Sequence, residues 1–234
     1  FRRWIEETLR RMPRSIRDLY RLGVFEAQIE SCHDKAALRA FLSAIEAWHD
    51  LPEAQRSMRG DLRKYLVRSL YAGARSALRL GDLQLARRLC FQCIREDEQT
   101  NHEEPVHKFS LAGRICLGTG ELDAAERALR LALDAEGPPQ RDWVFGLLAE
   151  VCQRRGDLAG AARWIEAHVQ EHRRSPALWR QLGVIRVQAR DMAGARAAFA
   201  SALVRDRCGR HHTLVHLGNL KREQGDLEGA ARAR

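Results

Sequence analysis

Apolar residues return at helical spacing through most of the chain, with polar and charged residues between them. In the stretch that starts at Asp34, the residues Ala37, Phe41 and Ile45 fall on one face of a helix, and Trp48 continues that face. Stretches of this kind alternate with short breaks that contain glycine and an acidic residue. The pattern predicts an all-α chain of short amphipathic helices, and alanine and leucine, its commonest apolar residues, favour helix over sheet.

The breaks recur along the chain at a nearly constant spacing of 39, 36, 34 and 35 residues. A glycine in the left-handed conformation would end one helix there, and the acid after it would cap the next. An alanine at a fixed offset would let the two helices approach closely. The spacing therefore predicts one helix hairpin per repeat, with a strained or differently built turn at Arg190. The breaks are Gly81-Asp82-Leu83, Gly120-Glu121-Leu122, Gly156-Asp157-Leu158, Arg190-Asp191-Met192 and Gly225-Asp226-Leu227, and the alanines are Ala86, Ala125, Ala161, Ala195 and Ala230.

At these positions the sequence resembles the tetratricopeptide repeat. The best match is Trp179-x-x-Leu182-Gly183 followed by Ala195-x-x-x-Phe199 and Ala202. The resemblance implies an all-α, right-handed superhelical solenoid of antiparallel helix hairpins, with about five repeats over residues 67–234 and the last one incomplete. The other matches are Leu214-x-x-Leu217-Gly218 with Ala230, Phe145-x-x-Leu148-Ala149 with Ala161 and Ile165, Phe109-x-x-Ala112-Gly113 with Ala125, Leu129 and Ala132, and Leu70-x-x-Gly73-Ala74 with Ala86, Cys90 and Cys93.

Residues 1–66 carry helical patterns that are out of phase with the repeats. The helix that starts at Asp34 would end before Pro52, and a second helix from about Glu53 would run on into the first repeat. We expect residues 1–66 to cap the N-terminal end of the solenoid or to be the tail of a preceding domain. A membrane-surface helix near the N-terminus is a further alternative. The last repeat stops partway through its second helix, which favours a fragment of a longer protein.

Charge and cysteine content narrow the function classes. The chain carries 40 Lys and Arg against 31 Asp and Glu, a formal net charge of +9. This excess is spread along the chain with no dense basic segment, which makes a nucleic-acid partner unlikely but is compatible with other anionic partners. No uncharged apolar run is long enough to cross a membrane. The six cysteines do not form the dense framework of a small secreted domain, so we expect reduced thiols and a cytoplasmic location.

Four short motifs invite a chemical interpretation, and each has a simpler structural one. His168-x-x-Glu171-His172 has the spacing of a zinc protease motif, but His168 takes a packing position at the end of a second helix. Cys90-x-x-Cys93 lacks the second ligand pair of a zinc site, and both thiols fall at buried repeat positions. Cys208, His211, His212 and His216 form a cluster of possible metal ligands, but we interpret them as a solvated helix start. The glycines from Gly113 to Gly120 resemble a phosphate loop but lack its lysine. We therefore expect no catalytic residue, no metal and no cofactor.

In the solenoid that the resemblance implies, the first helices line a concave surface that usually binds a peptide or a partner helix. Residues facing this groove should lie one turn from the packing face of each first helix. Arg75 and Arg114 hold equivalent places in neighbouring repeats, so their guanidinium groups would favour a carboxylate or phosphate on the ligand. The alternative is that they face solvent or pair with acids. The predicted peptide-binding groove consists of Arg68, Tyr71, Arg75, Arg79, His107, Arg114, Trp143, Glu150, Arg154, Arg180, Asn219 and Arg222.

Three function classes remain open. The leading hypothesis is a non-enzymatic protein–protein interaction scaffold that binds a peptide or partner helix of acidic character in a basic groove. The second is the docking region of a larger enzyme, such as a glycosyltransferase or sulfotransferase, whose catalytic domain lies outside this chain. The third is an RNA-binding helical repeat. It would need aromatic residues interleaved with arginine on one face, and Trp143 and Tyr71 alone give it little support.

Overall fold

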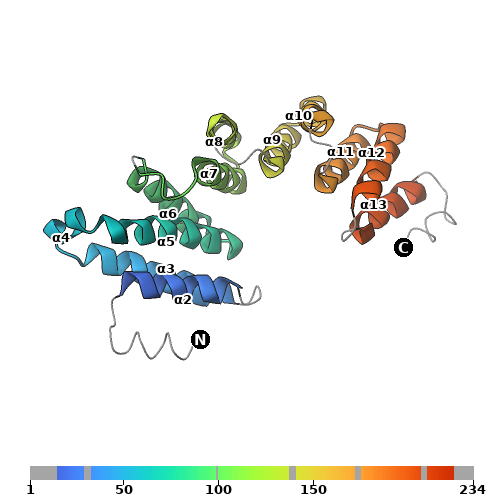
Figure 1. Cartoon of the computed structure of the whole chain (residues 1–234). Coiled ribbons are helices and arrows are strands. Elements are labelled where there is room, and N and C mark those ends of the chain that lie inside the picture. Colours follow the sequence, from blue (N-terminus) through green and yellow to red (C-terminus); the bar gives the residue numbers. More distant parts are fainter. Residues whose placement is uncertain are drawn as a thin grey trace. The chain divides into compact units, whose positions relative to one another are not determined.

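The computed structural model describes residues 15–28, 33–98, 100–136, 141–171, 175–206 and 210–223. Across these ranges the regular elements are α-helices and no strand occurs (Figure 1). The N-terminal segment up to residue 14 and the expected second helix of the last repeat lie outside them. The helices are α2 (Ile16–Gln28), α3 (Asp34–His49), α4 (Glu53–Met58), α5 (Gly60–Arg79), α6 (Leu83–Glu96), α7 (Pro105–Thr119), α8 (Leu122–Asp134), α9 (Asp142–Arg154), α10 (Leu158–Glu171), α11 (Pro176–Gln188), α12 (Met192–Arg205) and α13 (Arg210–Glu223).

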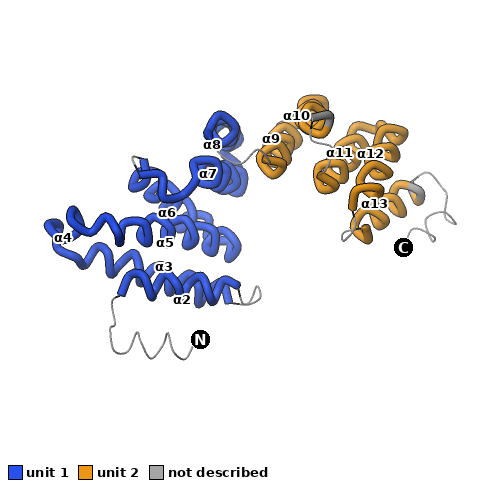
Figure 2. Tube along the Cα trace, in the orientation of Figure 1, with its two compact units in different colours: residues 1–137 blue, residues 138–234 orange. Residues whose placement is uncertain are grey.

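The chain forms two compact units, residues 1–137 (unit 1) and 138–234 (unit 2), coloured separately in Figure 2. In unit 1, α2–α3, α5–α6 and α7–α8 pack as hairpins, and contacts of α3 with α5 and of α6 with α7 join them. In unit 2, α9–α10 and α11–α12 are hairpins, joined by α10 and α11 and followed by α13. The prediction of an all-α repeat solenoid is confirmed. The division of the chain at residue 66 remains a prediction.

The first helices of successive hairpins also contact one another inside each unit. α2 contacts α5 and α5 contacts α7 in unit 1, while α9 contacts α11 and α11 contacts α13 in unit 2. Apolar side chains between the helices form the core, with Leu66, Leu70 and Ile115 at no more than 1% exposure in unit 1 and Ile165 and Leu182 at 0% in unit 2. A single hairpin cannot bury its apolar face alone, so each relies on its neighbours for a core.

The turns inside the hairpins follow the sequence prediction. Gly81, Gly120 and Gly156 have φ near +80°, and Arg190 takes the left-handed conformation with φ of 64°. The acid that follows accepts a hydrogen bond from the first turn of the next helix in three of the four hairpins. The bonds are Leu85 N to Asp82 Oδ1 at 3.0 Å, Gly160 N to Asp157 Oδ1 at 2.7 Å, and Gly194 N to Asp191 Oδ1 at 2.8 Å. Each bond satisfies a backbone N–H that the start of a helix leaves unpaired.

The hairpin α2–α3 is built like the repeats, although the sequence analysis did not recognise it as one. A Cβ atom on Gly23 would lie 2.5 Å from Cε1 of Phe41, and one on Gly183 would lie 2.5 Å from Cε1 of Phe199. In both hairpins a glycine therefore lets the ring of the second helix lie against the backbone of the first. The connection between α2 and α3 is longer than the turn of the other hairpins, so this hairpin is out of phase with them.

The expected continuous helix from Glu53 into the first repeat is wrong. α4 ends at Met58, and Arg59 has φ of −104° and ψ of 53°, outside the helical region. α5 then starts at Gly60, where a Cβ atom would meet nothing within 4 Å. Glycine is a poor residue for a helix interior and makes no packing contact here that would hold one continuous helix, so the break falls beside it.

Candidate functional site

A cleft of about 370 Å³ lies in unit 1, between the first helices α2 and α5. Its apolar part comes from α2, α3 and α5, namely Val24, Ala27, Phe41 and Ala72. Its polar part includes Arg68, Tyr71, Arg75 and Arg79, which α5 presents at successive turns on one side, as their spacing of three or four residues requires. These four belong to the groove predicted from the sequence. The remaining lining residues are Tyr20, Gln28, Ser76 and Glu103.

The arginines of the cleft differ in their surroundings. Arg79 donates from Nε to both carboxylate oxygens of Asp34, at 2.8 and 3.0 Å, and from Nη2 to Ser76 Oγ at 3.2 Å. Asp34 thereby neutralises much of its charge. The Arg75 guanidinium lies 5.7 Å from the ring centre of Tyr71, a cation–π contact, and Arg68 is exposed. Arg68 and Arg75 thus keep more of their positive charge exposed in the cleft than Arg79 does.

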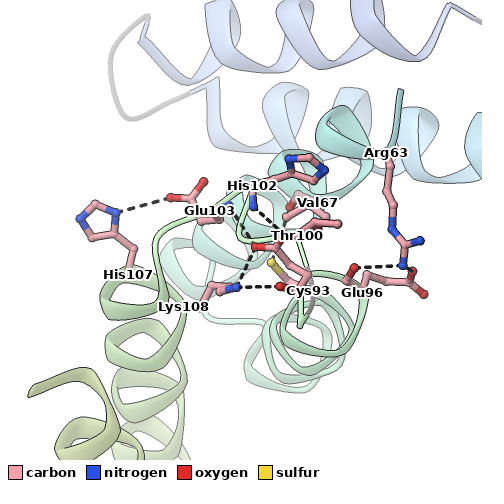
Figure 3. Close-up of polar contacts among 10 residues, drawn as sticks. Arg63, Val67, Cys93, Glu96, Thr100, His102, Glu103, His107 and Lys108 are labelled. Carbon is pink, nitrogen blue, oxygen red and sulfur yellow. Dashed lines mark hydrogen bonds and ion pairs between the residues drawn. The ribbon is translucent and has the colours of Figure 1, made fainter. Parts of the chain in front are cut away.

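The loop between α6 and α7 brings an acidic residue to the cleft, and a buried ion pair holds this loop in place (Figure 3). Lys108 Nζ lies 2.7 Å from Asp97 Oδ2, and both side chains are at most 4% exposed. Asp97 also accepts from His102 N at 2.6 Å, Glu103 N at 2.9 Å and Thr100 Oγ1 at 2.8 Å. Burial alone would raise the pKa of Asp97, but these hydrogen bonds hold it below its ordinary value. The carboxylate therefore stays ionised, and its hydrogen bonds hold the loop in this conformation.

Glu103 and His107 meet at the edge of the cleft. His107 Nδ1 lies 3.5 Å from Glu103 Oε1, the contact drawn in Figure 3, and 3.8 Å from Glu104 Oε2. The His107 ring also stacks on Tyr71 with centres 6.5 Å apart. Burial raises the pKa of Glu103, while the charges of His107 and Arg68 act in the opposite direction. His107, another predicted groove residue, is thus placed next to the cleft.

The predicted groove left out several residues of the cleft, among them Tyr20 and Glu103. Tyr20 stands on α2, which was not recognised as the first helix of a repeat, and its ring lies 5.7 Å from that of Tyr65. Leu19-x-x-Leu22-Gly23 is the signal that could have found α2. Glu103 carries no such signal, because its position depends on the loop that Asp97 and Lys108 hold in place.

The remaining predicted groove residues do not line this cleft. Arg114 is an exposed residue of α7. In unit 2, Arg154 Nη2 lies 2.7 Å from Glu150 Oε1, and Trp143 is 39% exposed. Two further pairs tie up predicted residues within the chain: Arg180 with Asp206, and Arg222 with Asn219. A hollow of about 620 Å³ in unit 2 is lined by residues outside the predicted groove, Met192, Ala193, Arg196, Ala197 and Ala200 of α12.

The motifs with possible chemistry take structural positions. Cys90 and Cys93 are at most 2% exposed, and burial raises the pKa of both thiols, that of Cys90 to about 12. The interpretation of this pair as buried thiols is confirmed. His168 is buried too, 2.6 Å from Asp142 Oδ1 through Nε2, and stacks on Phe145. The positions of His172 and Cys208 lie outside the described residues.

Two kinds of feature are absent from the described residues. In the ranges given above, no group of three or more His, Cys, Asp and Glu side chains is placed to hold a metal ion. None of the described helices combines the length and the apolar character needed to span a bilayer.

Several solved structures resemble the chain. A tetratricopeptide repeat protein from Parabacteroides merdae is 16% identical with a TM-score of 0.76, over 99% of this chain and 82% of that one. Pseudomonas aeruginosa pilF is 16% identical with a TM-score of 0.66, over 93% and 88%. YrrB, a TPR protein with an unusual peptide-binding site, is 14% identical with a TM-score of 0.50, over 78% and 89%. No protein-family model and no curated protein matches the chain. These similarities show the fold, which is that of tetratricopeptide repeat proteins.

Proposed function

We propose that the chain is a protein–protein interaction scaffold that binds an acidic peptide segment in the cleft of unit 1. The observation that carries this proposal is the convergence of Arg68, Tyr71 and Arg75 from α5 on one cleft whose other wall is α2. Side chains from two successive first helices thus face one cavity. This is the placement expected for a binding surface of stacked helix hairpins.

The charges around the cleft favour an acidic ligand. Arg68 and Arg75 face one acidic lining residue, Glu103, while Asp34 already neutralises Arg79. The cleft therefore keeps an excess of positive charge. Guanidinium groups bind carboxylates through paired hydrogen bonds, and these bonds are stronger where the site is partly shielded from water.

The shape and lining of the cleft suit a short peptide. A volume of about 370 Å³ lies at the lower end of the range for ligand sites, enough for a few side chains rather than a folded surface. Val24, Ala27 and Ala72 provide an apolar floor beside the arginines. We infer a ligand whose carboxylates bind the arginines while the aliphatic parts of its side chains lie on this floor. Binding of this kind needs no catalytic group, so we propose that the chain works as a non-enzymatic scaffold. It would act in the cytoplasm, either alone or as the docking region of a larger enzyme.

A peptide selection with a matched control tests this function. The full chain is panned against a library of random heptapeptides, and the selected peptides are measured by fluorescence anisotropy. We expect Asp and Glu to be enriched, and the double variant Arg68→Ala, Arg75→Ala to weaken binding at least about tenfold, since it removes two charge-assisted contacts. Arg39→Ala with Arg88→Ala removes the same charge from exposed positions of the second helices α3 and α6 and should leave binding unchanged.

Two results would contradict the proposal. One is a selection without acidic enrichment. The other is an equal loss of binding in both double variants, which would reflect net charge alone. Circular dichroism should show the same helical content and melting temperature in all variants. Salt-dependent binding of single-stranded RNA that fails in the Arg68 and Arg75 variant would assign the cleft to nucleic acid instead.

A further inference from the structure

Glu103 is the only acidic residue among the described residues that line the cleft. It comes from the loop between α6 and α7, whereas the arginines come from α5. Its carboxylate lies 3.5 Å from His107 Nδ1, and it shares the lining of the cleft with Arg68. The cleft therefore already contains the chemical group that an acidic peptide would bring to it.

The position of Glu103 is fixed by the structure around it. Its backbone N–H donates to Asp97 Oδ2 at 2.9 Å, and the Lys108 ammonium lies 2.7 Å from the same oxygen. The Glu103 side chain is 18% exposed, compared with 56% for its neighbour Glu104, although both carboxylates face His107. A partly buried carboxylate loses hydration, so this placement costs free energy that the exposed neighbour does not pay.

We propose that Glu103 is an internal competitor, whose carboxylate occupies the cleft lined by Arg68 where an acidic residue of the ligand would otherwise bind. The proposal rests on the function proposed above and adds a determinant of specificity to it. A ligand with one carboxylate brings no more negative charge to Arg68 than Glu103 already does. A ligand with consecutive acidic residues reaches Arg75 as well, and it returns Glu103 to water. The cleft should therefore favour runs of acidic residues over a single one.

The test uses the full chain and two dye-labelled probes, hexaglutamate and hexaglutamine, with binding followed by fluorescence anisotropy. Glu103→Gln should tighten hexaglutamate binding about five- to tenfold, because it leaves the positive charge of Arg68 entirely to the ligand carboxylates. Hexaglutamine binding should not change. Glu104→Gln is the matched control. It removes a carboxylate that also faces His107 but does not line the cleft, and it should shift the dissociation constant less than twofold.

A second background separates competition at Arg68 from a general change in charge. In Arg68→Ala, the further change Glu103→Gln should bring no gain in affinity. Glu103→Ala provides a second variant, and both changes keep the backbone N–H that binds Asp97. Circular dichroism checks that the helices are retained.

The outcomes distinguish this inference from the proposed function. If the unchanged chain binds hexaglutamate and Glu103→Gln binds it no more tightly than Glu104→Gln does, the competitor role is wrong and the acidic-peptide function stands. A full gain that persists in the Arg68→Ala background also overturns the competitor role. If neither the unchanged chain nor Glu103→Gln binds hexaglutamate, both proposals are wrong.

Discussion

Asp97 of unit 1 and Asp206 of unit 2 occupy the same place in their repeats, at the same offset from Ala86 and Ala195 and directly after the second helix. Their partners differ. Asp97 pairs with Lys108 on α7, the first helix of the next hairpin, and both side chains are almost fully buried. Asp206 pairs with Arg180 on α11, the first helix of its own hairpin.

The two pairs have opposite effects on the first helices. In unit 2, Asp206 neutralises Arg180, a predicted groove residue. In unit 1, the residue at the place of Arg180 is Tyr71, which lines the cleft, and Asp97 fixes the loop that carries Glu103. The repeat motif is the same in both units. The acidic partner, rather than the motif, decides whether a residue of a first helix is paired within the structure or is exposed in the cleft.

Cysteine chemistry should give the largest difference between the units. Cys90 of α6 stands where α12 has Phe199, and burial raises the pKa of its thiol from 9 to about 12. At pH 8 the native thiolate fraction is then about a thousandfold lower than in the unfolded chain, so iodoacetamide should label Cys90 about a thousandfold more slowly. Mass spectrometry of timed samples measures this rate, with the half-buried Cys152 of unit 2 as the internal reference. Equal rates at both residues would contradict the burial argument.

The same shift makes stability depend on pH. The Cys90 pKa is raised in the folded chain, so its stabilising contribution is complete below about pH 9 and is lost as the pH rises towards 12. In Cys90→Ala the loss of unfolding free energy between these two pH values should be smaller than in the unchanged chain. Urea titrations across this range measure it, and an identical pH dependence in both chains would count against it.

The two aspartates provide the next test. Asp97→Ala should lower the free energy of unfolding by about 3–5 kcal/mol, because it leaves the buried Lys108 ammonium without its carboxylate and with only the backbone carbonyl at 3.3 Å to accept from it. Asp206→Ala should cost only about 1 kcal/mol, since the Arg180 side chain is 22% exposed and can still reach water. Urea denaturation compares them. Lys108→Met is the control and should cost less than Asp97→Ala, because Asp97 keeps its bonds from Thr100 and the two backbone N–H groups. Equal losses for the two aspartates would remove the distinction between the units.

Packing between the helices of a hairpin should give a smaller effect. Gly183→Ala places a Cβ atom 2.5 Å from Phe199 and should cost about 1–3 kcal/mol of unfolding free energy. The hairpin α9–α10 has Ala149 and Ile165 at these two places. Phe199→Ile should therefore recover part of the loss when combined with Gly183→Ala. Additive losses in the double variant, measured by thermal unfolding, would show that the two positions do not interact.

The turn at Arg190 should give the smallest effect. Arg190→Gly relieves a side chain held at φ of 64° and should stabilise the chain by about 0.5–1 kcal/mol, because the greater freedom of glycine in the unfolded chain offsets part of the gain. Gly156→Arg, the reverse change at the equivalent turn, should destabilise it by a similar amount. A loss of stability in Arg190→Gly would mean that the contacts of the arginine side chain stabilise the fold by more than its left-handed conformation destabilises it.

The sequence predicted what depends on neighbours along the chain. Gly81 and Asp82 each act on residues only a few positions away, so the turn and cap at this hairpin could be derived from them. Arg68 and Tyr71 were placed on one side of α5 by helical spacing alone. The hairpin α2–α3 was missed because its longer connection breaks the repeat spacing.

The roles that the sequence could not settle depend on distant partners. Arg79 was predicted to face a ligand, but its partner Asp34 stands 45 positions away. Asp206 likewise lies 26 positions from Arg180. Helical periodicity carries no information about which acid will meet a given arginine. The position of Glu103 also depends on the packing of α7, which local pattern does not encode.

Gly23 contacts Phe41, and Gly183 contacts Phe199 in the same way. These contacts between the two helices of a hairpin determine the smallest segment that could be exchanged between repeats. The glycine of the first helix faces a ring of the second helix in these two hairpins and Leu129 in the case of Gly113, whereas the hairpin with Ala149 has Ile165 at the equivalent place. Shuffling single helices among hairpins would therefore produce mismatched interfaces. Recombination that moves whole hairpins would keep each pair intact, so the hairpin is the natural cassette for rebuilding or extending the array.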